Sequence, residues 1–273
     1  MESPVPGVGG GLVAKMPLPV RRRRPLSDAV PDREIERLRG VEPAVAAPLQ
    51  APELEIEPRT RSERLNRIVN VTLGVIGLVI LSPVFIIVAI AVRLTSPGPI
   101  FYSQTRVGLD RRWRRTLAMH ERRLQDLGGR AFTIYKFRSM FVDAEWQTGA
   151  VWATANDPRV TPIGRFLRKF RLDEIPQLLN VVRGEMNLVG PRPERPSIVV
   201  RLREDISEYQ LRQRVKPGIT GLAQINQQYD SCLDDVRQKV KFDVQYLREQ
   251  SLWLDLVIMV RTIPAVLGRM RGW

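Results

Sequence analysis

The feature that most constrains this chain is a run of 22 residues, from Val71 to Val92, without a charged side chain. Such a run is long enough to cross the hydrocarbon core of a bilayer, which is about 30 Å thick. Ser82 and Pro83 interrupt the run near its middle. A proline inside a helix removes a hydrogen bond and kinks the axis. We therefore expect a membrane-binding segment with a break at its centre.

Cationic residues flank both ends of this run, and the positive-inside rule favours cytoplasmic placement of such flanks. They are Arg59, Arg61, Arg64 and Arg67 before the run, and Arg93 and Arg106 after it. A straight helix would export one flank, whereas a re-entrant hairpin bent at Ser82 and Pro83 keeps both inside. Residues 63–94 are therefore predicted to form a re-entrant membrane helix, with a kinked transmembrane helix as the alternative. We expect the Ser82 hydroxyl to satisfy part of the backbone freed by the bend.

The charge of the chain is concentrated around the apolar run. The 273 residues carry 43 Lys and Arg against 29 Asp and Glu, a net charge of +14, which on its own would suggest nucleic-acid binding. Residues 1–58 net −1, however, whereas residues 59–130 net +9. This distribution favours anionic membrane lipid as a partner and argues against nucleic acid.

Residues 1–62 are predicted to be a disordered tail rich in proline and arginine. Ten of the 21 prolines lie within residues 1–58, and no apolar period runs through them. The tail is not a signal peptide, because it lacks an apolar core near its N-terminus. The single cysteine, Cys232, excludes a disulfide scaffold, and the single histidine, His120, excludes a His-clustered metal centre.

Residues 95–273 are predicted to form one small, mainly helical domain of the α+β class. Ile100–Val107 and Ala131–Phe137 are expected to be short extended segments, separated by an Arg-rich insertion at 109–130. Ser251 is expected to cap a final amphipathic helix that lies in the membrane interface. A preceding helix carries an apolar stripe typical of core packing, formed by Val236, Val240, Val244 and Leu247.

The centre of the domain contains two adjacent carboxylates, Asp173 and Glu174. Thr161 and Pro162 predict a helix upstream of them, because a capping hydroxyl precedes a proline at the first helical position. Pro176 forces a new helix to begin at about Asp173, because proline is tolerated only in the first turn. Gly184 is a natural stop for that helix. The two carboxylates are therefore expected at a helix N-terminus.

Two carboxylates at a helix start, just downstream of Arg168, Lys169 and Arg171, suit phosphoryl chemistry. The helix terminus stabilises anions by roughly 0.3–1 kcal/mol at exposed sites. An ionised carboxylate can attack phosphorus as a nucleophile, and its neighbour can hold Mg²⁺ together with substrate phosphates. The arginines would neutralise the charge on the phosphoryl oxygens. A capped helix with salt bridges is the alternative interpretation of this dipeptide.

Three further motifs follow in order, and each alone is a weak signal: Lys136-Phe-Arg-Ser-Met140, Gly190-Pro-Arg-Pro193 and the Gly-rich Lys216–Gln224. Taken together with the Ser82-Pro83 break and with Leu172–Gly184, they resemble the bacterial sugar transferase family, the monotopic polyprenyl-phosphate phosphoglycosyl transferases. The resemblance covers residues 64–267, which is nearly the whole chain apart from the tail.

This resemblance implies an enzyme on the cytoplasmic face of a bacterial inner membrane. It would transfer a sugar-1-phosphate from a UDP-sugar to undecaprenyl phosphate, the initiating step of exopolysaccharide, capsule or O-antigen lipopolysaccharide synthesis. Asp173 would attack the β-phosphorus, release UMP and carry the phosphosugar, while Glu174 and Asp173 would support Mg²⁺. The implied substrate-binding residues are Lys136, Arg138, Arg168, Arg192 and Asp255.

Two features depart from the family pattern. The stretch from Gly108 to Arg130 is longer than the usual link, and Gln227-Gln228-Tyr229 stands where many relatives have Gly-Arg-Asn. The sequence leaves the sugar, the pathway and a homodimer open. Two other function classes also stay open: a non-catalytic membrane-bound adaptor with a basic surface, and a phosphatase-like hydrolase with water as the acceptor.

Overall fold

The computed structural model describes residues 56–111, 127–142, 144, 157–227 and 233–269. The predictions for most of the N-terminal tail, for most of the Arg-rich insertion, and for His120, Gln228 and Cys232 lie outside these ranges. Within them, helices dominate and are accompanied by two small two-stranded sheets. This content confirms the α+β, mainly helical class.

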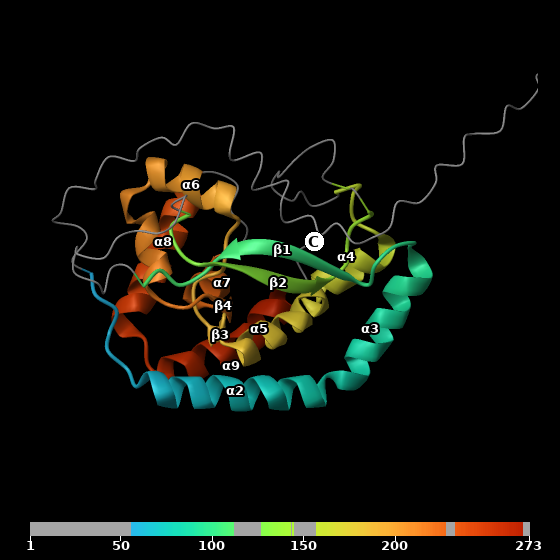
Figure 1. Cartoon of the computed structure of the whole chain (residues 1–273), viewed down its shortest axis with the longest axis horizontal. Helices are drawn as coiled ribbons and strands as arrows, with labels where there is room; N and C mark the ends of the chain where they lie inside the picture. The colour runs from blue at the N-terminus through green and yellow to red at the C-terminus, as the bar shows by residue number, and fades with distance from the viewer. Residues whose placement is uncertain (1–55, 112–126, 143, 145–156, 228–232, 270–273) are drawn as a thin grey trace, which may run out of the picture.

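Two helices joined at a sharp bend form one edge of the molecule (Figure 1). They are α2 (Glu63–Ile80) and α3 (Ser82–Thr95), and they are bent by 59° at the break. As predicted, the Ser82 hydroxyl donates a hydrogen bond to the carbonyl of Val79, at 2.8 Å. No single helix in the described ranges is long and apolar enough to cross a membrane, but α2 and α3 taken together are.

The outer side of this helix pair exposes an unusual amount of apolar surface. Its exposed large side chains are Leu65, Ile68, Leu73, Val75, Ile76, Val79, Ile80, Ile86, Ile87, Ile90 and Leu94. The last helix, α9 (Leu252–Arg269), adds Trp253, Leu256, Val260 and Ile263. Contiguous apolar surface of this kind marks contact with a membrane or another protein.

The inner side of α2 packs on the rest of the domain. Gly74 lies against the side chains of Val181 and Val182, and the buried Asn70 accepts a hydrogen bond from the Leu188 N–H at 2.6 Å. Arg67 donates to the carbonyls of Val181 and Val182. This flanking arginine therefore contacts the domain itself, although the sequence assigned it only to the membrane flank.

Two strands lie near the middle of the molecule (Figure 1). β1 (Phe101–Val107) and β2 (Ala131–Phe137) pair antiparallel, with Phe101 opposite Phe137 and Val107 opposite Ala131. The two expected extended segments are thus confirmed, and they form one hairpin. Tyr102 and Lys136 are register partners, so they lie on the same face of this sheet.

The segment around the two carboxylates consists of three short helices. α4 (Pro162–Lys169) begins as predicted, with the Thr161 hydroxyl accepting the Gly164 N–H at 2.9 Å. A 3₁₀ helix, η2 (Leu172–Gln177), follows and leads into α5 (Leu178–Arg183). The new start before Pro176 is confirmed, but the turns around Pro176 form a 3₁₀ helix and the α-helix begins only at Leu178.

The stop at Gly184 is also confirmed, because this residue has φ 84° and caps α5 in the left-handed conformation that favours glycine. Beyond it, the short strands β3 (Asn187–Val189) and β4 (Gly218–Thr220) pair in parallel. This pairing brings two of the sequence motifs, Gly190–Pro193 and Lys216–Gln224, next to each other.

The remaining helices pack on one another as a second group, which we call the α8 group, and their apolar contacts follow the predicted stripe. They are α6 (Pro196–Asp205), the 3₁₀ helix η3 (Ser207–Arg214), α7 (Leu222–Asn226) and α8 (Leu233–Glu249). Val236 and Val240 of α8 are buried against Tyr209. The Ser251 hydroxyl accepts the Leu254 N–H at 3.1 Å, which confirms the predicted cap of α9.

Candidate active site

Asp173 and Glu174 lie in the first turn of η2, and each is only 6% exposed. Arg171, two residues upstream of Asp173, has φ 57°, a left-handed backbone that is uncommon for residues other than glycine. This residue separates α4 from η2 and gives the two carboxylates a helix start of their own. Strained backbone of this kind clusters at functional sites.

Glu174 is held by three cationic side chains. Its Oε1 is 2.8 Å from Lys136 Nζ and 2.6 Å from Arg192 Nη2, and its Oε2 is 3.2 Å from Arg192 Nη1. Arg171 Nη1 lies 3.5 Å from Oε2. Burial alone would raise the pKa of Glu174, but Arg192, Lys136 and Arg171 hold that pKa well below its ordinary value. The carboxylate is therefore ionised and fixed in position.

Asp173 has the opposite environment. Its buried Oδ1 accepts no hydrogen bond from any residue within the described ranges. Burial, and after it the charge of Glu174, raises the pKa of Asp173, while Lys136, Arg171 and Arg168 oppose that rise. A buried carboxylate oxygen without a donor is costly and calls for an explanation. A free oxygen is what an attacking carboxylate needs.

Arg168 completes the ring of positive charge. Its half-buried side chain lies on α4, its charge acts on Asp173, and it has no hydrogen-bonding or ion-pairing partner among the described residues. With Lys136, Arg171 and Arg192, four cationic side chains thus act on two carboxylates. The excess of positive charge suits a diphosphate. The predicted residues Lys136, Arg168, Asp173, Glu174 and Arg192 are brought together here.

The structure places Arg138 elsewhere. Its guanidinium donates to the carbonyl and hydroxyl of Ser96, at 2.7 and 2.8 Å, and to the carbonyl of Pro97 at 2.6 Å. Arg138 is thereby buried in the turn that follows α3. These bonds give it a role in holding that turn, and its contact with substrate stays a prediction.

Asp255 lies in a cluster of its own at the start of α9. Its Oδ2 is 2.8 Å from Arg61 Nη1, and its Oδ1 accepts a hydrogen bond of 2.7 Å from the Tyr246 hydroxyl. These contacts join the segment before α2 to α8 and α9. The predicted role of Asp255 in substrate binding likewise stays a prediction.

The two motif loops support each other. The Gly218 N–H donates to the carbonyl of Pro191, and the Gly190 N–H donates to the carbonyl of Thr220, both at 2.9 Å. A side chain on Gly218 would collide with the backbone nitrogen of Gly190, so this close approach requires glycine. The Gly-rich loop therefore positions the loop that carries Arg192.

Sequence reasoning missed the charged residues behind the Arg192 loop. They are Arg106, Glu194, Arg212, Lys239 and Asp243. One signal was available for Asp243, which stands seven residues after Val236 in the apolar stripe of α8 and is 1% exposed. A carboxylate at a core position of a helix predicts a buried cationic partner. Arg106 was assigned to the membrane flank, but it is buried beside Glu194.

The site offers an incomplete set of ligands for a metal ion. No group of three or more His, Cys, Asp or Glu side chains capable of holding a metal occurs among the residues that the structure describes. Mg²⁺ often uses one or two carboxylates together with substrate phosphates and water. Asp173 Oδ1 is free to serve as such a ligand, whereas both oxygens of Glu174 already bind cationic side chains. In this arrangement Asp173 fits a metal ion, and the predicted metal role of Glu174 stays a prediction.

Comparison with known proteins identifies relatives of this chain. Residues 61–269 match the family described as bacterial sugar transferase. The UDP-N-acetylgalactosamine-undecaprenyl-phosphate N-acetylgalactosaminephosphotransferase of Aeromonas hydrophila is 39% identical over 203 residues, 74% of this chain and 44% of that protein. The UDP-glucose:undecaprenyl-phosphate glucose-1-phosphate transferase of Escherichia coli strain K12 is 41% identical over 201 residues, 73% of this chain and 39% of that protein.

A protein of Caulobacter vibrioides with the same name as the Escherichia coli relative is 36% identical over 212 residues, 77% of this chain and 72% of that protein. The chain thus spans less than half the length of the Aeromonas and Escherichia relatives. The family match includes the helix pair, the two carboxylates and both motif loops. This protein therefore belongs to the bacterial sugar transferase family.

Proposed function

We propose that this chain transfers a sugar-1-phosphate from a UDP-sugar to undecaprenyl phosphate, which releases UMP and forms a polyprenyl diphosphate-linked sugar. The observation that carries the proposal is the pair of unlike carboxylates, with Glu174 held by cations and Asp173 Oδ1 free. The relatives are named for glucose and for N-acetylgalactosamine, so they support a UDP-sugar donor without selecting the sugar.

Asp173 is the proposed nucleophile. A carboxylate oxygen attacks the β-phosphorus of the donor, the bond from that phosphorus to the bridging oxygen breaks, and UMP leaves with the electron pair. An oxygen of undecaprenyl phosphate then attacks the same phosphorus, which breaks the bond to Asp173 and restores the carboxylate. The second step requires no water, and exclusion of water would prevent loss of the sugar phosphate.

The cationic side chains have separate proposed roles. The Arg168 side chain makes no hydrogen bond or ion pair with another described residue, so its guanidinium is available to bind the donor diphosphate. Lys136 and Arg192 hold Glu174, and their positive charge stabilises the additional negative charge on the phosphoryl oxygens. Glu174 in turn keeps these two cations beside Asp173.

We propose Mg²⁺ as the cofactor. When bound, the ion would neutralise charge on the donor diphosphate, and Asp173 would hold it through the carboxylate oxygen that does not attack the phosphorus. Chelation by EDTA is expected to stop UMP release, and added Mg²⁺ is expected to restore it. Undiminished turnover in EDTA would exclude the metal.

We further propose that the exposed apolar side of α2, α3 and α9 binds the cytoplasmic face of a bacterial inner membrane. The 59° bend and the hydrogen bond from Ser82 to Val79 support a re-entrant path, in which both ends of the pair stay on one side. In a Cys232→Ser background, Thr60→Cys and Pro99→Cys place labels before α2 and after α3. An impermeant maleimide should label both cysteines in inside-out vesicles and neither in spheroplasts. Labelling of one cysteine in inside-out vesicles and of the other in spheroplasts would demonstrate a span.

The activity is tested by incubating the purified protein with UDP-sugars, with and without undecaprenyl phosphate. A transferase gives catalytic UMP release and a lipid-linked diphosphate sugar only when the lipid is present. Free sugar phosphate without the lipid would identify a hydrolase. No UMP from any UDP-sugar would favour the adaptor and contradict the proposed activity.

A further inference from the structure

The loop of residues 191–194 carries Arg192, which binds Glu174, yet it has no regular secondary structure of its own. Two of its four residues are prolines, which have no N–H to donate. Each of its four carbonyls nevertheless accepts a hydrogen bond from another element. In chain order the donors are Gly218 N, Arg212 Nη2, Arg106 Nη1 and Val107 N, at 2.9, 3.1, 3.2 and 2.9 Å.

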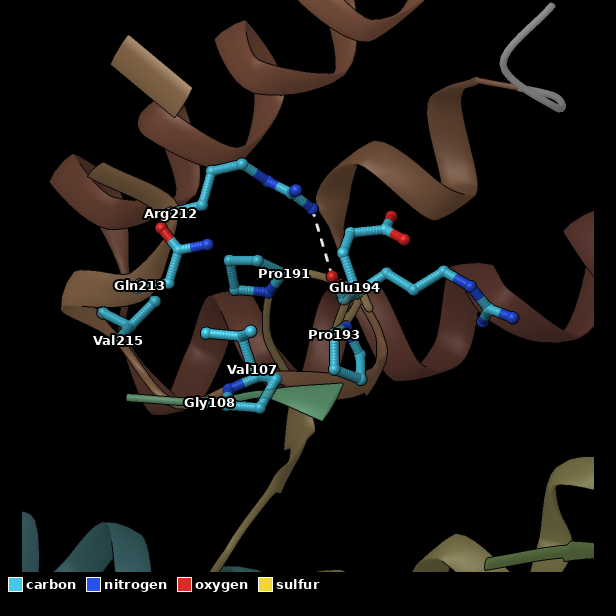
Figure 2. Close-up of a pocket in the computed structure, with 10 residues that line it drawn as sticks. Val107, Gly108, Pro191, Pro193, Glu194, Arg212, Gln213 and Val215 are labelled. Carbon is cyan, nitrogen blue, oxygen red and sulfur yellow. Dashed lines mark hydrogen bonds between the residues drawn. The ribbon is translucent and has the colours of Figure 1, made fainter. Parts of the chain in front are cut away.

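The bond to the carbonyl of Arg192 comes from a buried ion pair. Arg212 Nε lies 2.6 Å from Asp243 Oδ2, and both side chains are 2% exposed. Figure 2 shows the Arg212 side chain reaching toward the loop, with this hydrogen bond dashed. The Tyr209 ring lies 4.9 Å from the guanidinium, which adds a cation–π contact. Arg212 is therefore fixed on one side by Asp243 and Tyr209, and it holds the loop on the other.

The far end of the same loop is held by a second set of charges. Lys239 Nζ lies 2.8 Å from Glu194 Oε1, and Arg106 Nη1 lies 3.6 Å from Glu194 Oε2. Burial would raise the pKa of Glu194, but Lys239, Arg212 and Arg106 lower it to about 2. Both ends of the loop are thus anchored by ionised groups on η3, α8 and β1.

We propose that Arg212 and Asp243 are positioning residues, which fix the carbonyl of Arg192 and thereby hold its guanidinium against Glu174 beside Asp173. This inference rests on the proposed transferase activity. The pair does not touch the two carboxylates in any described contact, so its effect passes through the loop. Glu174 would then lose its shortest contact, the 2.6 Å bond to Arg192, when the loop is released.

A double replacement separates this role from a contribution to stability. In Arg212→Met with Asp243→Leu, both charges are removed together, and hydrophobic residues of similar volume in place of a buried ion pair often preserve stability. The matched control is Arg237→Met with Asp234→Leu, which makes the same substitutions in an exposed ion pair of α8. We expect the buried double variant to keep its melting temperature and to lose turnover by about 10²-fold, since small misplacements near reacting groups cost that much.

A double-mutant cycle tests whether the effect passes through Arg192. In an Arg192→Ala background the double replacement should cause little further loss of kcat, because the group that it positions is already absent. The proposal is overturned if the loss of kcat in the combined variant equals the product of the losses in Arg192→Ala and in the double replacement. It is also overturned if the double replacement alone turns over as fast as the control variant. If the wild-type protein itself releases no UMP, the proposed activity fails, and the positioning role is then decided by the following measurement.

Hydrogen exchange reads the loop independently of activity. Peptides containing the amides of Val107 and Gly218, which donate to the carbonyls of Glu194 and Pro191, should exchange faster in the buried double variant than in the control. Unchanged exchange would overturn the proposal. If the double variant does not fold, Arg212→Lys serves instead, because a lysine ammonium cannot reproduce both bonds of the planar guanidinium fork. Faster exchange of the Val107 and Gly218 amides is again expected, and unchanged exchange again contradicts the positioning role.

Discussion

Helices α2 and α8 are of nearly equal length, 18 and 17 residues, but they distribute their side chains in opposite ways. α8 buries Val236, Val240 and Leu247 and directs most of its charged side chains to the surface. α2 buries Asn70 and Gly74, while Val79 is 67% exposed. The difference supports the proposal that α8 faces water and that the outer side of α2 faces the apolar interior of a membrane.

The two carboxylates lie between the region of α2 and the region of α8. α2 packs directly on α5, which continues from η2. On the other side, α8 and η3 of the α8 group contact the Arg192 loop. The proposed nucleotide-sugar donor and lipid phosphate acceptor would meet at such a boundary. The comparison therefore predicts that chemistry, membrane binding and acid stability can be disrupted separately.

Replacing the nucleophile should have the largest effect. Asp173→Asn removes the attacking carboxylate, so UMP release is expected to fall by roughly 10³-fold or more. The variant should still sediment with membranes, because α2 and α3 are unchanged. Asp234→Asn on the exposed side of α8 is the control and should retain wild-type turnover. Full turnover in Asp173→Asn would show that the covalent mechanism is wrong.

Placing a charge on the apolar side of α2 should detach the protein. Ile76 is 46% exposed, and burying a carboxylate in a membrane costs about 2.5–3.5 kcal/mol. We expect Ile76→Asp to shift the protein to the soluble fraction in a flotation assay. Gln245→Asp on the exposed side of α8 should leave it membrane-bound. Equal retention of both variants would contradict the contrast between the two helices.

Acid should weaken the contacts between the Arg192 loop and the α8 group before it affects the apolar contacts of α2. The pKa of Glu194 is about 2 in the folded protein, against an ordinary 4.5. Its contribution to stability is therefore complete above about pH 4.5 and is lost as the pH falls toward 2. Thermal unfolding measured from pH 7 to pH 3 should show a smaller acid-dependent decline in Glu194→Gln. If the melting temperatures of the wild type and of Glu194→Gln fall equally with pH, Glu194 does not cause the loss of stability in acid.

A larger side chain at the contact between α2 and α5 should have a smaller effect. A Cβ added to Gly74 would lie 3.4 Å from side-chain atoms of Val181 and Val182, so the longer side chain of Gly74→Leu should push the helices apart. Overpacking of this kind costs about 1–3 kcal/mol. We expect a lower melting temperature together with retained membrane binding. Ile68→Leu on the exposed side of α2 is the control.

The local signals in the sequence predicted where elements begin and end. Thr161 with Pro162, Gly184 and Ser251 each act through neighbouring backbone groups, so their effect is visible in a short window. The helical stripe of α8 was predictable for the same reason. The order of the motifs also identified the family, and the family favoured phosphoryl chemistry at Asp173 and Glu174 over a capped helix with salt bridges.

The pairings between distant residues could not be read in the same way. Lys136 and Arg192 are 38 and 18 residues from Glu174, and only the folded chain brings them to it. Arg138 and Arg192 both stand in motifs, but one holds a turn and the other binds Glu174. The three-residue strands β3 and β4 are too short to have a recognisable period.

The most direct measurement of the central claim is mass spectrometry of the protein after incubation with UDP-sugars in the absence of undecaprenyl phosphate. Without the acceptor the first step should stop at the covalent stage. The peptide that contains Asp173 is expected to gain the mass of one sugar phosphate and to lose it when undecaprenyl phosphate is added. Lipid-dependent turnover with an unmodified Asp173 peptide, or with the adduct on another residue, would contradict Asp173 as the nucleophile.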